Sequence, residues 1–376
     1  MSSRRGWGPG ATERMLARDG HYMDRALLLA ARGLGRTSPN PLVGAVVVSP
    51  DGIVVGQGFH RRAGEAHAEV YALNMAGARA RGSTLYCTLE PCCHVGRTGP
   101  CVPRIVDAGV ARVVAAVEDP NPMVHGRGFD YLRAHGVGVD VGVGAESAVA
   151  LNQPFFTLVR ERRPFVVLKA ATSRDGRIAE APGRPTALTS AAANRHAHRV
   201  RAEVEAIGVG VGTVLTDDPS LTARGAYRER PLTRVIFDRR LRTPPGARVL
   251  STREAGPVII MTTAEAARRG DVRRALEDRG AEIEIAGDDS VRAALERLGA
   301  RDIDSLLLEG GALLHAAAWD EGLVDFVRLY VTPHVLGPGG VPFLDGRTFS
   351  WADLIDGCVE PLGPDVLMEG YVHWPR

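Results

Sequence analysis

Apolar positions in the first part of the chain follow two different spacings. Apolar residues three and four positions apart predict helices at residues 21–35, 66–80 and 101–110. Dense apolar and β-branched runs predict a hairpin at 43–59, turning at Pro50, Asp51 and Gly52, and strands at 83–90 and 111–120. This alternation of strands and helices favours a sheet with helices packed on it.

A second series of elements follows and does not resemble the first. Apolar runs predict strands at residues 163–171, 204–211, 233–238, 257–263, 281–286, 305–311 and 325–333, and helical spacing predicts helical stretches at 263–280 and 290–300. Residues 144–164 join the two series. We therefore predict an α/β protein with a first domain at residues 1–148 and a second at 149–376.

The composition is that of a soluble globular protein. With 376 residues, two domains are expected, and the net charge of +2 is too small to favour non-specific binding of nucleic acid. No apolar run approaches the ~18 residues of a membrane span. Residues 1–20 have no apolar segment of the kind found in a signal peptide and are interpreted as a flexible tail. A cytoplasmic location follows, where thiols stay reduced.

Cysteines are concentrated in one short segment. Three of the five lie within residues 88–101, in "TLEPCCHVGRTGPC", and Cys87 comes just before it. Since disulfides are rare in the cytoplasm, a metal site or catalysis explains the cluster better. Cys92 and Cys93 are adjacent and point in different directions, so one of them is expected to bind metal. Gly96 and Gly99 allow the chain to turn back toward Cys101.

A histidine and a carboxylate precede this cluster. His67 and Glu69 form "HAE" at the start of a predicted helix. A His-x-Glu followed by Pro-Cys is typical of zinc-dependent deaminases, in which three protein ligands leave one position for water. The alternative is a closed structural site made by His67 and three cysteines. Glu69 argues against it, because a hydrolytic zinc site needs a carboxylate to move protons and a structural site does not.

The chain resembles the RibD family of bifunctional riboflavin-biosynthesis enzymes, in which a deaminase is fused to a reductase. The resemblance rests on "TSPNPLVGAVVV", "GEAHAEVYAL", "TLEPCCHVGRTGPC" and "DPNPMVHGRG", and it extends over nearly the whole chain. It implies a cytidine-deaminase-like domain followed by a dihydrofolate-reductase-like domain. It also implies zinc held by His67, Cys92 and Cys101, with Glu69 as proton shuttle. Asn40 is a candidate for holding the pyrimidine, with a simple turn role as the alternative.

The second half contains a possible phosphate site. Residues 306–317 run from a buried strand through Gly310 and Gly311 into a helix, and a helix N-terminus after glycines suits a phosphate. The stretch "GVGVGT" at 208–213 does not fit the G-x-G-x-x-G pattern, so a Rossmann domain is not predicted. Lys169, the only lysine in the chain, lies in "LKAATSRDGRIA" at a predicted strand end.

The family resemblance assigns roles to residues in this half. It implies that NADPH is bound by Ala171, Ala187, Thr213, Asp217, Gly311, Ala312, Leu313, Leu314, His315, Ala316 and Ala317. It implies that the substrate is bound by Pro185, Arg201, Leu221, Arg224 and Glu309. Guanidinium groups suit a sugar phosphate. In "GRPTALTS" the family typically has a serine and a tryptophan where this chain has Pro185 and Ala187, which puts the efficiency of the reductase in doubt.

Together these features predict a cytoplasmic zinc-dependent aminohydrolase fused to an NADPH-dependent oxidoreductase. By the resemblance, it deaminates 2,5-diamino-6-ribosylamino-4(3H)-pyrimidinone 5′-phosphate and then reduces the ribosyl chain to ribityl. The expected partner is this small-molecule nucleotide, without nucleic acid or membrane, and a homo-oligomer is expected. The alternatives are a deaminase with an impaired or repurposed reductase half, a nucleic-acid deaminase, and a non-catalytic zinc module.

Overall fold

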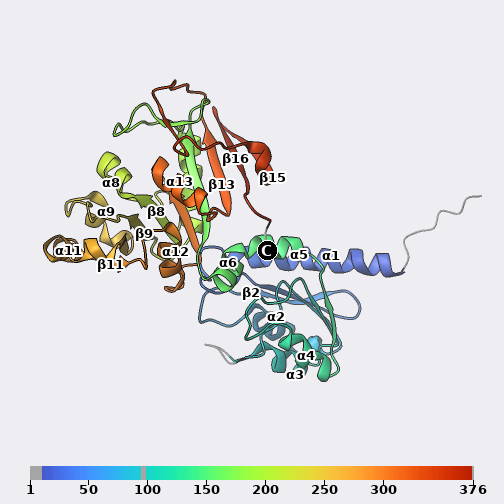
Figure 1. Ribbon diagram of the computed structural model, residues 1–376. Coiled ribbons are helices and arrows are strands. Elements are labelled where there is room, and N and C mark those ends of the chain that lie inside the picture. The colour runs from blue at the N-terminus through green and yellow to red at the C-terminus, as the bar shows by residue number, and fades with distance from the viewer. Residues whose placement is uncertain (1–10, 95–98, 375–376) are drawn as a thin grey trace, which may run out of the picture. The chain divides into compact units, whose positions relative to one another are not determined.

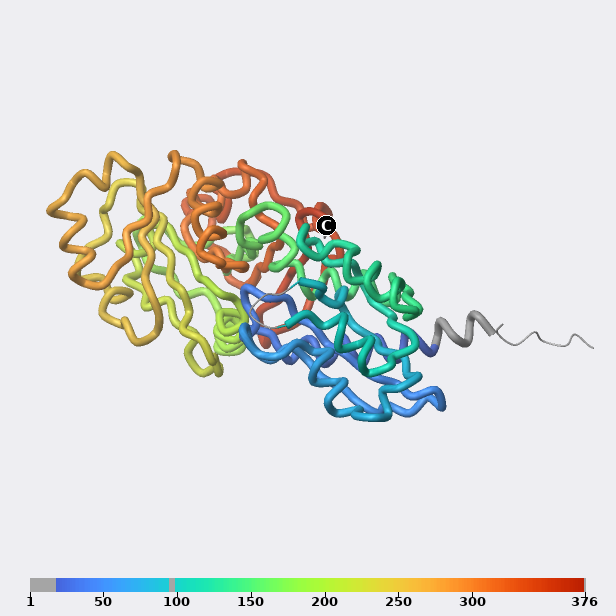
Figure 2. The backbone as a smooth tube through the Cα atoms, turned by 90° about the horizontal axis from the view of Figure 1, so that it is seen from below, coloured from blue at the N-terminus to red at the C-terminus, as the bar shows by residue number. Residues whose placement is uncertain are grey.

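The chain folds into two compact units, Met1–Arg160 and Glu161–Arg376 (Figure 1). The computed structural model describes residues 11–94 and 99–374. Each unit is formed by one continuous stretch of the chain, coloured blue to green in the first unit and green through yellow to red in the second (Figure 2). The boundary predicted near residue 148 lies within helix α5 (Ala145–Leu151), which the structure places in the first unit together with most of α6 (Gln153–Glu161).

The first helix is longer than the sequence predicts. Helix α1 spans Ala11–Ala30, so the interpretation of residues 1–20 as a flexible tail is wrong for 11–20, and residues 1–10 lie outside the described residues. The buried carboxylate of Asp19 accepts hydrogen bonds from the Tyr86 hydroxyl at 2.6 Å and from the Arg112 guanidinium at 3.0 and 2.7 Å. These bonds attach the early turns of α1 to the sheet.

A five-stranded sheet forms the centre of the first unit. In spatial order its strands are β2 (Val54–Phe59), β1 (Gly44–Val48), β3 (Thr84–Cys87), β4 (Arg112–Ala115) and β5 (Gly138–Val141). The β1–β2 hairpin is antiparallel as predicted, β1 is antiparallel to β3, and β3, β4 and β5 run parallel. The short strand β5 was not predicted, since three of its four residues are exposed.

Helices cover both faces of this sheet. One face packs against α2 (Ala68–Ala76), followed by a 3₁₀ turn at Gly77–Ala80, and against α3 (Cys101–Asp107) and α4 (Arg127–Ala134). The other face packs against α1 and α5. Because side chains alternate along a strand, Ala45 and Val47 contact the first layer while Val46 and Val48 contact the second.

The second unit is built on a nine-stranded sheet in the described part of the chain. Its spatial order is β11 (Ala281–Ile285), β10 (Val258–Thr262), β9 (Thr233–Phe237), β8 (Ala206–Gly210), β12 (Ser305–Glu309), β6 (Phe165–Thr172), β13 (Phe326–Val331), β16 (Asp365–Tyr371) and β15 (Ile355–Leu362). The strands from β11 to β13 run parallel, and β16 and β15 are antiparallel. A separate small ribbon pairs β7 (Arg177–Ala179) with β14 (Val341–Pro342).

Helices again lie on both faces. The helices that pack on the sheet are α7 (Ala191–Glu203), α8 (Val211–Asp217), α9 (Arg248–Ser251) and α11 (Gly270–Glu277) on one side, and α12 (Val291–Gly299) and α13 (Ala312–Asp320) on the other. The helical stretch predicted at 263–280 is divided into α10 (Ala264–Ala267) and α11. No helix among the described residues has the length and apolarity needed to cross a membrane.

Candidate functional site

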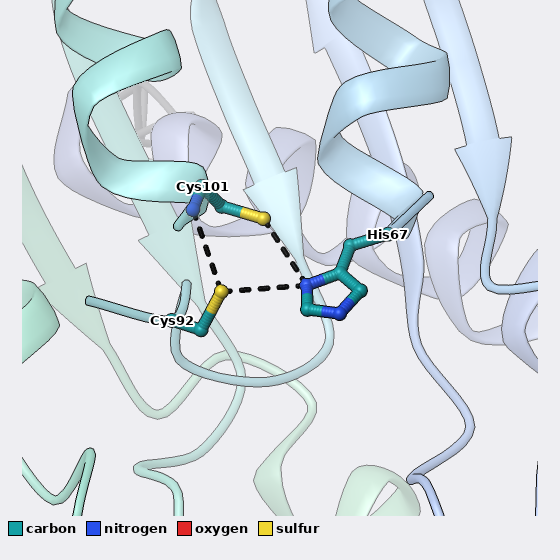
Figure 3. A group of neighbouring side chains, drawn as sticks. All are labelled: His67, Cys92 and Cys101. Atoms are coloured by element: carbon teal, nitrogen blue, oxygen red, sulfur yellow. Dashed lines mark hydrogen bonds between the residues drawn. The ribbon is translucent and has the colours of Figure 1, made fainter. Parts of the chain in front are cut away.

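Three potential metal ligands meet at one end of the first sheet. His67 is the residue before α2, Cys92 follows β3, and Cys101 is the first residue of α3. Both sulfur atoms point toward the same ring nitrogen of His67 (Figure 3). Each Sγ lies 3.3 Å from His67 Nδ1, and all three ligand atoms lie within 4.8 Å of one another. Gly96, in the turn between the cysteines, lies outside the described residues.

This donor set fits a catalytic zinc ion. Bonds of about 2.0 Å to nitrogen and 2.3 Å to sulfur place the ligands of a tetrahedral zinc roughly 3.5 Å apart. The observed separations of 3.3 Å between Sγ and Nδ1 are close to that value. Three protein ligands leave one tetrahedral position for water or substrate.

The electrostatics of the cluster also suit a metal. Hydrogen bonds from the Cys101 thiol and from His67 lower the pKa of the Cys92 thiol, although burial opposes the shift. The cluster thus favours the thiolate form of Cys92, which is the form that binds metal. The Cys101 backbone amide also donates to Cys92 Sγ at 3.4 Å, so the start of α3 stabilises that negative charge.

Glu69 lies in the first turn of α2 and faces this cluster. Its side chain is buried, and its Oε2 atom has no hydrogen-bond partner among the described residues. Burial raises the pKa of the Glu69 carboxyl. A buried carboxyl with an unpaired oxygen beside a metal-ligand set is suited to exchanging protons with a water or substrate there.

The other cysteines stay outside the ligand set. Cys93 turns away from the cluster, with its Sγ 3.9 Å from the Met123 carbonyl oxygen. Cys87 is fully buried in β3, where burial raises the pKa of its thiol, and Cys358 is exposed on β15. The structure thus separates Cys92 from Cys93 as their adjacency predicts.

His60 and Asp119 lie near the cluster and were not among the predicted site residues. The Nε2 atom of buried His60 lies 3.1 Å from Nδ2 of the predicted residue Asn40, and the His60 and His67 rings stack edge to face with centroids 5.4 Å apart. Asp119 follows β4, and burial raises the pKa of its carboxyl to about 7. In the sequence, each of the two is a polar residue at the end of an apolar run, His60 in "GFH" and Asp119 in "VEDP", and this was the available signal.

The second unit has a large cleft of about 1380 Å³. Its lining comes mainly from the residues that follow the parallel strands β6, β8, β9, β10, β11 and β12. The chain adds β8 to β11 in one direction and then returns to insert β12 between β8 and β6. Ligands of open α/β sheets bind at the carboxyl ends of strands where the order reverses in this way.

Two glycines form the floor of this cleft at the reversal point. Gly310 and Gly311 have φ values of 81° and 90°, a conformation that side chains rarely adopt. A Cβ atom on Gly310 would lie 3.0 Å from Thr213 Oγ1. The starts of α8 and α13 therefore approach each other closely, and their amide groups suit a pyrophosphate.

An ionic cluster lies next to these glycines in the same cleft. Glu309 and Lys169 are partners in the register of β12 and β6, with Nζ 3.5 Å from Oε2. Arg201 on α7 donates to both oxygens of Glu309 at 2.7 Å. Although burial opposes ionisation, the charges of Lys169 and Arg201 lower the pKa of Glu309 to about 2. The cluster contributes one anion and two cations, leaving a net positive charge.

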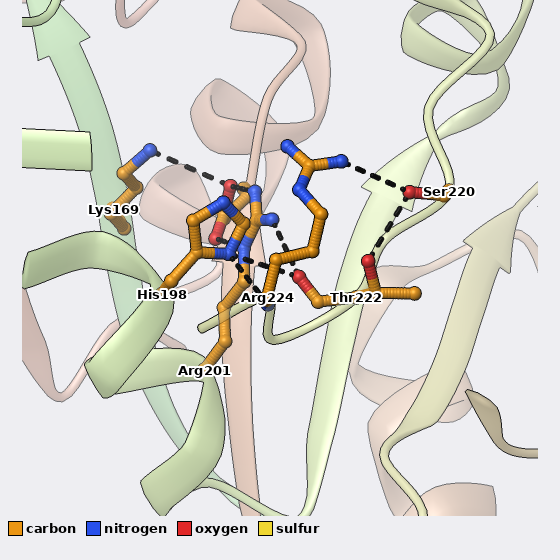
Figure 4. Close-up of polar contacts among 7 residues, drawn as sticks. Lys169, His198, Arg201, Ser220, Thr222 and Arg224 are labelled. Atoms are coloured by element: carbon orange, nitrogen blue, oxygen red, sulfur yellow. Dashed lines mark hydrogen bonds and ion pairs between the residues drawn. The ribbon is translucent and has the colours of Figure 1, made fainter. Parts of the chain in front are cut away.

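The loop after α8 is tied to this cluster. Arg201 Nη1 and His198 Nδ1 lie 3.0 and 3.1 Å from the Thr222 carbonyl oxygen (Figure 4). The exposed guanidinium of Arg224 lies 3.5 Å from Ser220 Oγ. Leu221, between them, is buried and has a φ of 52°. The loop is thus held in a strained conformation beside the ion cluster.

The cleft collects most of the residues predicted for the reductase. Its lining includes Ala171, Pro185, Ala187, Arg201, Thr213, Asp217, Leu221, Glu309, Gly311, Ala312, Leu313, Leu314, His315 and Ala317. Ala316 and Arg224 are not in the lining: Ala316 is buried, and Arg224 is exposed on the loop after α8. Lys169 lines the cleft without having been predicted as a site residue.

Family models match both halves of the chain. The RibD C-terminal domain matches residues 164–368, and the cytidine and deoxycytidylate deaminase zinc-binding region matches residues 16–117. The chain belongs to the RibD family. Both domains of the family are enzymatic, so this RibD-family chain is a deaminase and a reductase of riboflavin biosynthesis.

Relatives and solved structures agree over nearly the full length. Riboflavin biosynthesis protein RibD of Aquifex aeolicus is 42% identical over 85% of this chain and 88% of its own. RibD of Escherichia coli is 39% identical over 93% and 98%. The structure of Acinetobacter baumannii RibD is 36% identical, covers 95% of this chain and 99% of its own, and has a TM-score of 0.83. These matches confirm the predicted order of a deaminase-like and a dihydrofolate-reductase-like domain, and the predicted zinc and NADPH.

Proposed function

We propose that the first unit deaminates a ribosylated diaminopyrimidinone 5′-phosphate and that the second reduces the ribosyl chain of the product. The observation that supports it most is the pairing of a three-ligand metal cluster beside Glu69 with a dinucleotide-sized cleft, in one chain. A matching structure from Thermotoga maritima, 35% identical with a TM-score of 0.81, is titled a diaminohydroxyphosphoribosylaminopyrimidine deaminase and 5-amino-6-(5-phosphoribosylamino)uracil reductase.

In the deaminase unit, His67, Cys92 and Cys101 hold the metal and Glu69 moves protons. A zinc ion held there would supply the Lewis acidity that hydrolytic deamination requires. Glu69 would accept a proton from the water that attacks the ring carbon and deliver it to the departing nitrogen, which leaves as ammonia. Asn40, positioned by His60, orients the pyrimidine.

In the reductase unit, the ion cluster holds the sugar chain. Bound NADPH would supply a hydride to the ribose carbon, and the amides at the starts of α8 and α13 would hold its pyrophosphate. Arg201 and Glu309 position the ribosyl group, and Arg224 reaches its phosphate. Lys169, an ammonium group in the cleft, delivers the proton that accompanies the hydride.

The direct experiment supplies the diaminopyrimidinone nucleotide and NADPH to the full chain. We expect ammonia release first and then NADPH oxidation in equal amount. Ammonia without NADPH oxidation would support a deaminase with an impaired reductase, since Pro185 and Ala187 line the cleft. Activity on RNA but not on the free nucleotide would support a nucleic-acid deaminase, which the net charge of +2 disfavours.

The same proposal covers location and assembly. We place the enzyme in the cytoplasm, acting on a free nucleotide as a homo-oligomer. The gathering of Cys92 and Cys101 with His67 as a metal-ligand set supports a reducing compartment such as the cytoplasm. The exposed outer strand β15, which pairs only with β16, offers an edge to a second copy. Light scattering on the purified chain measures the oligomeric state.

We expect the purified protein to hold about one zinc ion per chain. Cys92→Ser and Cys101→Ser each remove a thiolate from the cluster and should lower zinc content by at least ~10-fold. Cys93→Ser is the matched control and should retain zinc, because Cys93 faces Met123. Elemental analysis after dialysis measures this. Zinc lost from Cys93→Ser and kept by Cys101→Ser would overturn the ligand assignment.

Arginines after β9 should determine the preference for NADPH. Arg239 and Arg240 line the cleft beyond Asp238, are exposed, and have no side-chain hydrogen bond or ion pair with the described residues. Thr243 donates twice to Asp238 at 2.7 Å and closes this loop. An arginine near the end of this strand can accommodate the 2′-phosphate of NADPH.

We therefore expect the double variant Arg239→Ala, Arg240→Ala to bind NADPH ~10–100-fold more weakly, since a hydrogen bond to a charged group is worth about 1.5–3 kcal/mol. Binding of NADH, which lacks the 2′-phosphate, should stay unchanged. Fluorescence titration of both cofactors measures the ratio. Arg195→Ala, at an exposed position of α7, is the control. An equal loss for both cofactors would argue against 2′-phosphate recognition.

A further inference from the structure

Glu90 forms an unusual set of hydrogen bonds beside the metal cluster. It lies between β3 and Cys92, and its side chain is 3% exposed. Its Oε2 accepts from the amides of Asp119 at 3.2 Å and Gly126 at 2.9 Å. Its Oε1 accepts from the amides of Gly128 at 2.8 Å and Phe129 at 3.4 Å. Four backbone donors from the segment 119–129 thus converge on one carboxylate.

That segment follows β4, the strand next to β3. Because β3 and β4 run parallel, the segment and Cys92 leave the sheet at the same edge. The segment begins with Asp119, whose Oδ1 accepts from the Asn121 amide at 2.8 Å, and it ends at the start of α4. Its Met123 carbonyl oxygen faces Cys93. Residues 119–128 therefore border the metal-binding segment, residues 90–94, which carries the ligand Cys92.

A second contact holds the same two segments together. Gly128 packs so closely against the chain before Cys92 that a Cβ atom there would lie 2.2 Å from the Pro91 carbonyl oxygen. Glu90 and Gly128 thus attach residues 119–128 to the segment that carries the ligand Cys92. The backbone amide of Glu90 also donates to the Val117 carbonyl oxygen at 3.0 Å, so its own position is fixed by the sheet.

We propose that Glu90 is a positioning residue for deamination, which holds the segment 119–128 as a wall of the pyrimidine pocket against the metal-binding segment. The proposal rests on the proposed deaminase function. Glu90 does not touch the reacting atoms: both of its oxygens are occupied by backbone amides. It acts by fixing Asp119 and Asn121 where the substrate meets them.

The test uses Glu90→Gln in the full chain. The side-chain amide nitrogen of glutamine is a donor and would face backbone N–H donors. At least one of the two pairs of hydrogen bonds that the Glu90 oxygens accept would therefore break. We expect KM for deamination to rise at least ~10-fold, with zinc content and reductase turnover within ~2-fold of the wild type. General destabilisation would lower the active fraction and therefore apparent kcat, and would leave KM unchanged.

Two further variants sharpen the result. Gly128→Ala should raise KM in the same way, because its Cβ forces the segment away from Pro91. Asp130→Asn, an exposed acidic position in the same first turn of α4, is the matched control and should leave KM unchanged. An unchanged KM in Glu90→Gln, or loss of zinc or of the reductase with it, would overturn the proposal. A wild-type chain that releases no ammonia would instead overturn the proposed deaminase function.

Discussion

Glu69→Gln should lower the rate of deamination by at least ~100-fold while the chain keeps its zinc and its reductase activity. Glutamine has nearly the same shape as glutamate, so the first turn of α2 and the position of His67 before it should be preserved. What the variant loses is a carboxylate that can accept a proton and release it again. Ammonia release under saturating nucleotide measures the loss.

The Glu69→Gln substitution disturbs few other contacts. Glu69 is buried, and its Oε2 has no partner among the described residues, so the change breaks no hydrogen bond of that atom. Glu65→Gln is the matched control, since in the described part of the chain its carboxylate accepts a hydrogen bond from the Tyr71 hydroxyl at 3.2 Å. Near-normal ammonia release by Glu69→Gln, with zinc bound, would remove Glu69 from the mechanism and favour a structural metal site.

Much of the fold could be predicted because its strands are buried on both faces. Strands such as β1, β10 and β12 are buried along their whole length and appear in the sequence as unbroken apolar runs. The strands that were not predicted are less buried: β5 and β15 are mostly exposed, and β7, β14 and β16 are only partly buried. Their pairing is determined by contacts with distant segments, which local hydrophobicity does not indicate.

The residues of the candidate site likewise differ in whether the sequence alone could identify them. His67, Glu69, Cys92 and Cys101 lie in two short motifs whose residue types already indicate zinc chemistry. Lys169 gains its significance only from the register that places it beside Glu309. Glu90 likewise depends on a loop 29 to 39 residues away. In a chain with 45 arginines, sequence also could not separate Arg201, which pairs with Glu309, from Arg224, which is exposed.

Lys169→Met should lower the rate of NADPH oxidation by at least ~100-fold while the deaminase stays active. Reduction of the sugar chain adds a hydride to carbon and needs a proton for the neighbouring heteroatom. Lys169 is the only lysine in the chain, and its side chain is 14% exposed in the cleft. The ammonium group lies 5.4 Å from the centre of the buried Tyr330 ring and 3.5 Å from Glu309, so it is held in one place.

The variant should fold, because the buried charge of Glu309 keeps a partner. Arg201 continues to donate to both Glu309 oxygens at 2.7 Å when the lysine is gone. Lys169→Arg then separates the role of Lys169 as a proton donor from its role as a positive charge. Arginine restores the positive charge but holds its proton too firmly to act as an acid. If Lys169 is the proton donor, both variants should lose turnover under saturating NADPH and nucleotide, and both should still bind NADPH in a fluorescence titration. Recovery of turnover in Lys169→Arg would show instead that Lys169 acts through its charge, by holding Glu309 in place.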